Sequence, residues 1–181
     1  TTADSVKSRR CSFVTETTPD HLGRELSDLA FGIVEQNWLE QHIGKAIDLK
    51  TIDQRDAAEW ELTYFILFAI THGCGTFAPT DPEHTTAVLK AFHGILLRQI
   101  AEQAGQEVAE AHRQNLPARY RLYGDAVKGE EPNGRYQLLG EAAAIQILGK
   151  ALEDAHTADN FRETMKVIFS EVRGAAIKTM Q

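Results

Sequence analysis

Apolar residues recur every three or four positions along most of this chain, which is the spacing of one face of an α-helix. The first stripe consists of Leu22, Leu26, Leu29, Ile33 and Val34. It follows Thr18–Pro19–Asp20, where a threonine N-cap and a proline in the first turn are typical of a helix start. The stripe continues through Trp38 and Leu39 toward Ile43, and Gly44 is the expected end of this helix.

The second predicted helix is apolar on nearly all sides. It begins near Asp53, and the apolar run extends from Leu62 to Ile70. A helix without a polar face is buried. A strand is the alternative, because the run is rich in aromatic residues and isoleucine. Helix-forming residues from Arg55 to Glu61 lead directly into it and favour one long central helix, which ends at His72–Gly73–Cys74–Gly75 where two glycines break the pattern.

The next two helices are delimited by proline and glycine. Pro79–Thr80–Asp81–Pro82 predicts a turn and a helix start, and the helix after it ends at Gly105. Its apolar stripe consists of Val88, Leu89, Phe92, Ile95, Leu96 and Ile100. Another helix starts near Gln106. We expect Pro117 to interrupt it, because proline lacks the N–H donor and clashes with the preceding turn, and a second piece to run from Ala118 to Val127.

The remainder of the chain predicts a loop and two helices. The segment from Gly129 to Gly134 is the clearest loop signal. A helix is expected from Arg135 to His156, and residues Thr157 to Asn160 are expected to cap the last helix. The apolar face of that helix consists of Phe161, Met165, Ile168, Phe169 and Val172.

These elements predict an all-α fold: a single-domain bundle of about six helices over residues 19–181, preceded by an extended N-terminal arm over residues 1–18. The arm is polar and carries Lys7, Arg9 and Arg10. Because the loops are short, we expect consecutive helices to pack as antiparallel neighbours. The arm is the segment best placed to reach another subunit, so a homo-oligomer is one expectation.

Charge and composition narrow the classes of partner. The 181 residues carry a formal net charge of -7, whereas sequence-independent nucleic-acid binding and docking on anionic membranes both need a basic face. The apolar run at Leu62 to Ile70 is too short to span a bilayer. Cys11 and Cys74 are the only cysteines, which predicts reduced thiols in a cytoplasmic protein, with one disulfide as the alternative. We therefore expect a protein partner or self-association, with neither a membrane nor nucleic acid as partner.

Signatures of common enzyme classes are missing from the sequence. It contains no GxSxG, GxxxxGK[ST], GxGxxG or HExxH motif. Three of the five serines lie in the arm and two, Ser27 and Ser170, lie within predicted helices. The sequence therefore favours a non-enzymatic protein and identifies no cofactor.

His93 is the first candidate ligand. It shares a helix face with Leu89, Leu96 and Ile100, and a buried imidazole can coordinate haem or a metal. The alternative is a core histidine satisfied by a backbone carbonyl or by Tyr64. A helical position alone does not distinguish the two interpretations.

Two Asp/Glu-x-x-His pairs suggest a metal site of the kind that helical di-iron proteins build from two Glu-x-x-His motifs and further glutamates. They are Glu153 with His156 and Asp81 with His84. Both lie at predicted helix ends and not in the middle of the bundle, and a histidine in the last turn of a helix also interacts favourably with the helix dipole.

His72 and Cys74 flank Gly73 at the end of the central helix. A histidine beside a thiol can generate a thiolate nucleophile. Catalysis also requires a carboxylate to orient the histidine. The alternative is a glycine-rich helix end that contains a small buried cysteine.

Arginine and tyrosine alternate around Pro117, and this pattern can hold phosphate or contact a partner. The residues are Arg113, Arg119, Tyr120, Arg121 and Tyr123. Five acids balance the five bases between Gln106 and Arg135, so the alternative is a solvated helix whose arginines pair locally.

Two functions remain as hypotheses. The first is a non-enzymatic protein-interaction or assembly subunit, favoured by the acidic composition, the arm and the missing motifs. The second is a ligand- or cofactor-binding protein for haem, a metal or a small apolar molecule, built around His93, His72 and Cys74. Trp38 and Trp60 fit either hypothesis, because tryptophan is common at core edges and at interfaces.

Overall fold

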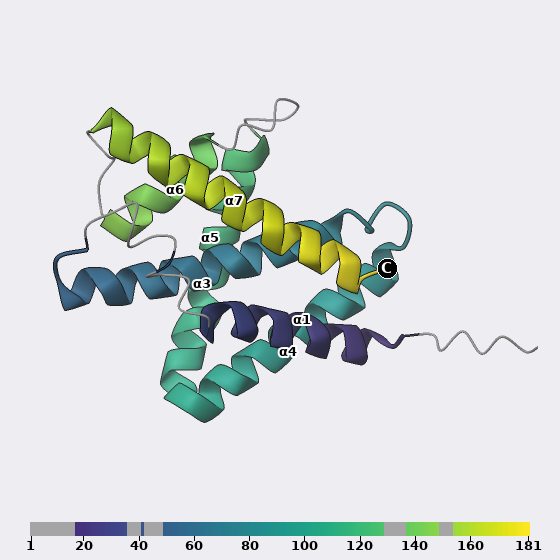
Figure 1. The fold of residues 1–181 in the computed structure, drawn as a ribbon. Helices are drawn as coiled ribbons and strands as arrows, with labels where there is room; N and C mark the ends of the chain where they lie inside the picture. Colours follow the sequence, from purple (N-terminus) through teal and green to yellow (C-terminus); the bar gives the residue numbers. More distant parts are fainter. Residues whose placement is uncertain (1–16, 36–40, 42–48, 129–136, 149–153) are drawn as a thin grey trace, which may run out of the picture.

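A computed structural model describes residues 17–35, 41, 49–128, 137–148 and 154–181 of the chain (Figure 1). Within these ranges there are six α-helices and no strands, which confirms the all-α prediction. The helices are α1 (Pro19–Glu35), α3 (Ile52–Gly75), α4 (Pro82–Ala104), α5 (Gln106–Lys128), α6 (Gln137–Leu148) and α7 (Ala155–Thr179). Most of the predicted arm, together with Trp38, Gly44 and the loop at Gly129 to Gly134, lies outside the described residues.

The central helix is α3, as the apolar run predicts, and the strand alternative is wrong. Every residue from Leu62 to Ile70 except Thr63 is buried. The helix starts with a capping box at Thr51, whose side chain accepts a hydrogen bond from the backbone N–H of Gln54. The Gln54 side chain in turn accepts from the backbone N–H of Thr51. A helix is possible here because the other five described helices all pack against α3 and cover the apolar surface that a solvated helix would expose.

The main helix pairs are not consecutive in sequence, which corrects part of the expected packing. The pair α1 and α4 lies side by side below α3, and α7 crosses α3 from above (Figure 1). Gly23 meets Ala91, and residues farther along both helices share one pocket, so α1 and α4 run in the same direction. The contacts of Phe65 with Phe169 and of Gly73 with Ala176 show the same for α3 and α7.

Antiparallel packing of consecutive helices does occur in two places. Helices α4 and α5 join at Gly105, whose φ of 99° suits a glycine, and a side-chain hydrogen bond then links His93 to Tyr120. Helices α6 and α7 are linked by an ion pair between Glu141 and Arg162. The expectation holds for these two pairs, but the two largest helix contacts join α1 to α4 and α3 to α7, which are not consecutive.

Three glycines in the described helices, Gly23, Gly73 and Gly140, allow neighbouring helices to approach each other closely. A Cβ atom added at Gly23 would lie 2.7 Å from the Ala91 Cβ and 2.8 Å from the Phe92 backbone nitrogen. A Cβ at Gly73 would lie 2.8 Å from the Arg173 carbonyl oxygen. Gly73 lies inside α3, and its missing side chain allows α7 to pack directly against α3 at this point.

Two predicted helix boundaries are wrong. Pro117 lies inside a continuous α5 and does not divide it, because one lost hydrogen bond is outweighed by packing on both sides of the proline. His156 belongs to α7 and not to the end of the preceding helix. The Asp154 carboxylate accepts a hydrogen bond from the Thr157 backbone N–H at 2.7 Å, and this N-cap starts α7 three residues before the predicted cap at Thr157 to Asn160.

Among the described helices, α3 included, none combines the length and the hydrophobicity that crossing a lipid bilayer requires.

Candidate functional site

The most unusual group in the core is the Glu61 carboxylate. Glu61 lies on α3 with 3% of its surface exposed. The Tyr123 hydroxyl donates a hydrogen bond to one carboxylate oxygen, and Arg119 Nε donates to the other at 2.8 Å. Arg119 and Tyr123 are one turn apart on α5, so they present their side chains to the same point. A buried charge needs partners of this kind.

Burial controls the protonation of this group. Removal from water raises the pKa of Glu61, against the smaller opposing effects of the Tyr123 hydrogen bond and the Arg119 charge. Burial also raises the pKa of Tyr123, and the nearby Glu61 charge raises it further. Tyr123 therefore stays protonated and acts as a donor to Glu61 throughout the ordinary pH range.

The contacts continue along α3 to the surface. One turn from Glu61, the Tyr64 hydroxyl lies 2.7 Å from His112 Nδ1 on α5. The Trp60 ring covers His112, with a distance of 3.9 Å between the ring centroids. Burial lowers the pKa of His112. The imidazole is therefore neutral at physiological pH and is enclosed by aromatic rings.

His93 has a complete set of partners within the protein. Its Nδ1 lies 2.8 Å from the Leu89 carbonyl oxygen and its Nε2 lies 2.7 Å from the Tyr120 hydroxyl. The carbonyl can only accept, so Nδ1 carries the proton and Nε2 accepts from Tyr120. The Tyr120 oxygen in turn accepts from Thr71 at 3.3 Å. Both imidazole nitrogens are thus hydrogen-bonded. The backbone carbonyl expected as a partner is present, whereas the hydroxyl partner is Tyr120 and not Tyr64.

The structure separates the five arginine and tyrosine residues around Pro117. Tyr123 and Arg119 turn inward to Glu61, and Tyr120 turns inward to His93. Arg113 is exposed and pairs locally with Glu110 at 3.6 Å, and Arg121 is exposed. The expected local pairing therefore occurs at Arg113, whereas Arg119 pairs with an acid on another helix.

The turn at the end of α3 places His72 and Cys74 in different surroundings. Cys74 is fully buried, and burial raises the pKa of its thiol to about 11. His72 contacts the rings of Phe68 and Phe169 and accepts a hydrogen bond from Arg173 at 3.2 Å. A thiol with a raised pKa is a poor source of thiolate, so this arrangement offers no activated nucleophile. Cys11 lies outside the described residues.

The two predicted metal pairs have structural contacts. Asp81 is the N-cap of α4 and accepts from the His84 backbone N–H. His156 is exposed and lies 3.2 Å from Asn160 Nδ2, while Glu153 falls outside the described residues. No cluster of three or more histidine, cysteine, aspartate or glutamate side chains suited to a metal ion occurs in the described ranges.

An apolar pocket of about 210 Å³ lies between α1, α3 and α4. It uses the face of α3 next to the one that carries Glu61 and Tyr64, and Trp60 stands at the border of the two faces. Its lining consists of Ala30, Phe31, Val34, Glu35, Trp60, Thr63, Ile66, Leu67, Leu96, Ile100, Gln103 and Ala104. At the rim, 40% of Val34 and 39% of Trp60 are exposed, so apolar surface is accessible from outside.

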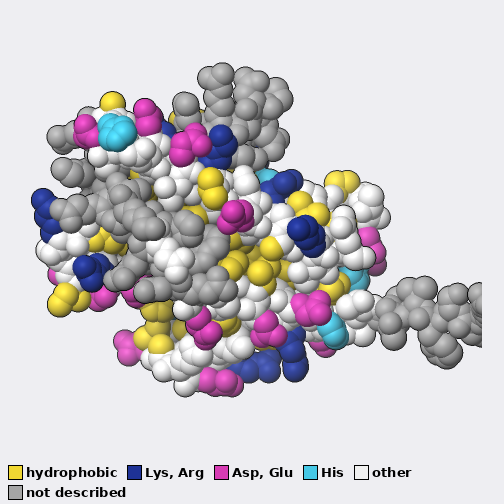
Figure 2. Space-filling view, viewed as in Figure 1, with side chains coloured by type: hydrophobic (Ala, Val, Ile, Leu, Met, Phe, Trp, Pro, Cys, Tyr) yellow, Lys and Arg dark blue, Asp and Glu magenta, His cyan; other side chains and the backbone are white. Residues whose placement is uncertain are grey.

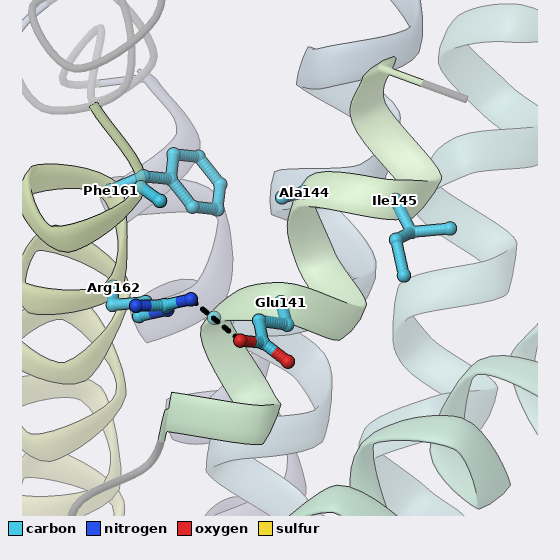
Figure 3. A pocket seen from close by; sticks show the side chains of 7 residues that line it. Glu141, Ala144, Ile145, Phe161 and Arg162 are labelled. Carbon is cyan, nitrogen blue, oxygen red and sulfur yellow. Dashed lines mark hydrogen bonds and ion pairs between the residues drawn. The ribbon is translucent and has the colours of Figure 1, made fainter. Parts of the chain in front are cut away.

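A smaller cavity of about 70 Å³ lies between α6 and α7 (Figure 3). Arg162 and Glu141 point toward each other across it, with 2.6 Å between Arg162 Nη2 and the carboxylate oxygen. Asp159 accepts from the other terminal nitrogen of Arg162 at 2.9 Å. Two carboxylates already neutralise this guanidinium, and the space holds little more than water.

Sequence reasoning missed Glu61, Tyr64, His112 and the pocket. A usable signal was present: a glutamate and a tyrosine one turn apart stand at the edge of an apolar run on a helix predicted to be buried. Buried acids require partners, and the alternating arginine and tyrosine of the next predicted helices supply them. The pocket has no such signal, because its lining comes from three separate helices.

Comparisons with known proteins identify no relative from which a function could be inferred. No protein-family model matches the chain, and no curated protein or solved structure matches it either. The residues around the pocket and the polar contacts therefore carry the argument.

Proposed function

We propose that this chain is a non-enzymatic binding protein that holds a small, uncharged, apolar molecule in the pocket between α1, α3 and α4. The observation that carries the proposal is an open pocket of about 210 Å³ whose lining is mostly aliphatic and aromatic. Apolar cavities of similar size, roughly 150 Å³, bind benzene-sized molecules when opened inside other helical proteins.

The lining supports an uncharged ligand. Most of the pocket surface comes from aliphatic and aromatic side chains. Thr63 is polar, but its hydroxyl donates to the Glu59 carbonyl oxygen at 2.9 Å and is already satisfied. Glu35 and Gln103 are exposed residues at the rim. A charged molecule would lose its hydration without gaining a partner inside the pocket.

The polar groups of the core support a role without catalysis. Glu61, Arg119 and Tyr123 bond to one another, and none of them lines the pocket. His93 has both ring nitrogens engaged, which disfavours it as a haem or metal ligand. A ligand in this pocket would touch apolar groups and no nucleophile.

Trp60 makes the proposal testable by fluorescence. Replacing the second tryptophan by Trp38→Phe leaves Trp60 as the only indole, and naphthalene serves as the apolar probe. We expect naphthalene to quench Trp60 emission to saturation and to raise the thermal unfolding midpoint, since a ligand at one hundred times its dissociation constant adds about 2.7 kcal/mol to stability. Native mass spectrometry of the purified protein would reveal a co-purified molecule as extra mass.

A blocking variant separates this pocket from other apolar surfaces. Ala30→Leu adds bulk to the pocket wall, whereas Ala118→Leu adds the same bulk at an exposed position on α5. Only the first should weaken naphthalene binding. Equal binding to both variants, or no saturable binding to the parent protein, would overturn the proposal.

A further inference from the structure

A groove between the first turns of α1 and the middle of α4 is rich in positive charge. We call it the basic groove; it is lined by Arg24 of α1 and by Lys90 and Arg98 of α4, with Asp20 at one end. Its open volume is about 540 Å³. Lys and Arg side chains gather along the lower edge of the molecule over α4 (Figure 2). The groove is therefore a local positive surface on a chain with a formal net charge of -7.

The three cations are available to a partner. Within the described part of the chain, none of Arg24, Lys90 and Arg98 forms an ion pair or a side-chain hydrogen bond, whereas Arg113, Arg119 and Arg162 are all paired. Unsatisfied like charges that share one groove repel each other, and an acidic partner relieves that repulsion.

Helix geometry sets the spacing of the charges. Lys90 and Arg98 are eight residues apart on α4, which corresponds to about 12 Å along the helix axis. Gly94 lies between them, and a Cβ atom added there would meet nothing within 4 Å. The floor between the two cations is thus open, with Ile95 beside it.

We propose that the basic groove docks an acidic segment of a protein partner, with carboxylates about 12 Å apart meeting Lys90 and Arg98 and a third meeting Arg24. This surface is distinct from the apolar pocket. In this proposal it is where the protein partner expected from the sequence binds. The apolar floor and the Asp20 carboxylate favour a peptide over nucleic acid, because a nucleic-acid site needs a longer basic track and aromatic rings for stacking.

Fluorescence anisotropy with a labelled decaglutamate peptide tests the proposal. We expect saturable binding at low salt that weakens as salt is added, because exposed charges are screened. The double variant Lys90→Glu with Arg98→Glu should weaken binding by about tenfold, because it replaces two attractive contacts with the peptide carboxylates by two repulsive ones. The matched control, Arg121→Glu with Lys128→Glu on the exposed side of α5, has the same net charge and should bind nearly as well as the parent.

A variant without a change of charge tests whether the shape of the basic groove contributes to peptide binding. Gly94→Leu fills the floor of the groove, and leucine is more favourable than glycine within a helix, so circular dichroism should show an intact fold. We expect this variant to weaken peptide binding several-fold. The proposal is overturned by any of four results: no saturable binding at low salt, equal weakening in the two double variants, tighter binding of a single-stranded oligonucleotide of the same charge, or self-association that the groove variants abolish.

Discussion

Glu61 shows how strongly a single buried carboxylate depends on its donors. Tyr123 and Arg119 both donate to it, and the two differ in their access to water: Tyr123 is fully buried, while 30% of the Arg119 side chain is exposed. When the acid is removed, Arg119 can turn outward to solvent but the Tyr123 hydroxyl cannot. The loss of stability on removing Glu61 therefore comes mainly from the Tyr123 hydroxyl, which is left buried without an acceptor.

The first prediction follows from that difference. Glu61→Ala should lower the free energy of unfolding by about 2 to 3 kcal/mol, because it leaves the Tyr123 hydroxyl buried without an acceptor and opens a cavity. Adding Tyr123→Phe should recover part of the loss, because it removes the unsatisfied hydroxyl. Urea unfolding of the parent, both single variants and the double variant measures the effect. Additive losses would show that the two groups do not act on each other.

Glu61 also makes stability depend on pH in a defined direction. Its pKa is raised from 4.5 by burial, so the folded state holds the proton over a range where the unfolded state has lost it. This contribution is fully present below pH 4.5 and is lost as pH rises through the raised value. The stability of the parent relative to Glu61→Gln should therefore be greatest at acid pH and decline toward neutrality, and a flat difference would contradict the assignment.

The second prediction concerns His93 and Tyr120. Burial lowers the pKa of His93 from 6.5, so the unfolded state binds a proton first and stability is lost as pH falls below 6.5. His93→Phe should reduce this loss and should cost about 1 to 3 kcal/mol at pH 8, since it leaves the buried Tyr120 hydroxyl without its acceptor. Some acid sensitivity should remain, because the pKa of His112 is lowered in the same direction.

Visible absorption spectra of the parent and of His93→Phe distinguish a packed histidine from a histidine that coordinates a cofactor. The hydrogen bonds of His93 to Leu89 and Tyr120 predict that His93→Phe changes stability alone. A purified parent protein with a visible absorption band that the variant loses would identify His93 as a cofactor ligand instead.

At the scale of helices, the sequence predicts the features that have a local cause and does not predict those that depend on distant parts of the chain. The start of α4 at Asp81–Pro82 and the end of α3 near Gly75 follow from capping and glycine, which act within one turn. The continuity of α5 through Pro117 and the pairing of α1 with α4 do not, because they depend on surfaces brought together from distant parts of the chain.

The candidate site divides in the same way. The arginine and tyrosine pattern is visible in the sequence, where it predicts a contact with an anion or a partner or, alternatively, arginines that pair locally. Its partner was not visible, because Glu61 is 58 residues away from Arg119 and 62 from Tyr123. Residue type therefore identified half of each contact, and helix packing supplied the other half.

The third prediction compares two glycines on the same helix. Gly23→Ala places a Cβ 2.7 Å from Ala91 and 2.8 Å from the Phe92 backbone, so α1 must move away from α4. Gly32→Ala meets nothing within 4 Å. Alanine favours the helix at both positions by up to about 1 kcal/mol, but overpacking should make Gly23→Ala destabilising by about 1 to 3 kcal/mol. Thermal unfolding of the two variants, moving in opposite directions, checks the close α1–α4 contact.

At the scale of the whole molecule, the core contains several weak acids, one cysteine thiol and three tyrosine hydroxyls, that burial keeps protonated. Burial raises the pKa of the Cys74 thiol from 9.0 to about 11, and it also raises the pKa values of Tyr64, Tyr120 and Tyr123. These four groups lie on α3 and α5, so the same interior that excludes water keeps all of them protonated. Any condition that ionises them must first open the bundle.

The fourth prediction is that the bundle unfolds cooperatively in alkali. Above about pH 9 the unfolded chain releases protons that the folded chain retains, so stability falls as pH rises through 9.0 for Cys74 and 10.0 for the tyrosines. Tyrosinate absorbance and far-ultraviolet circular dichroism should therefore change together in one pH titration. Cys74→Ala should move the transition to higher pH, because it removes one of the four linked protons. Tyrosines that ionise near their ordinary pKa while helicity is retained would show that water reaches the α3–α5 interface, and the buried Glu61 contacts would then need another explanation.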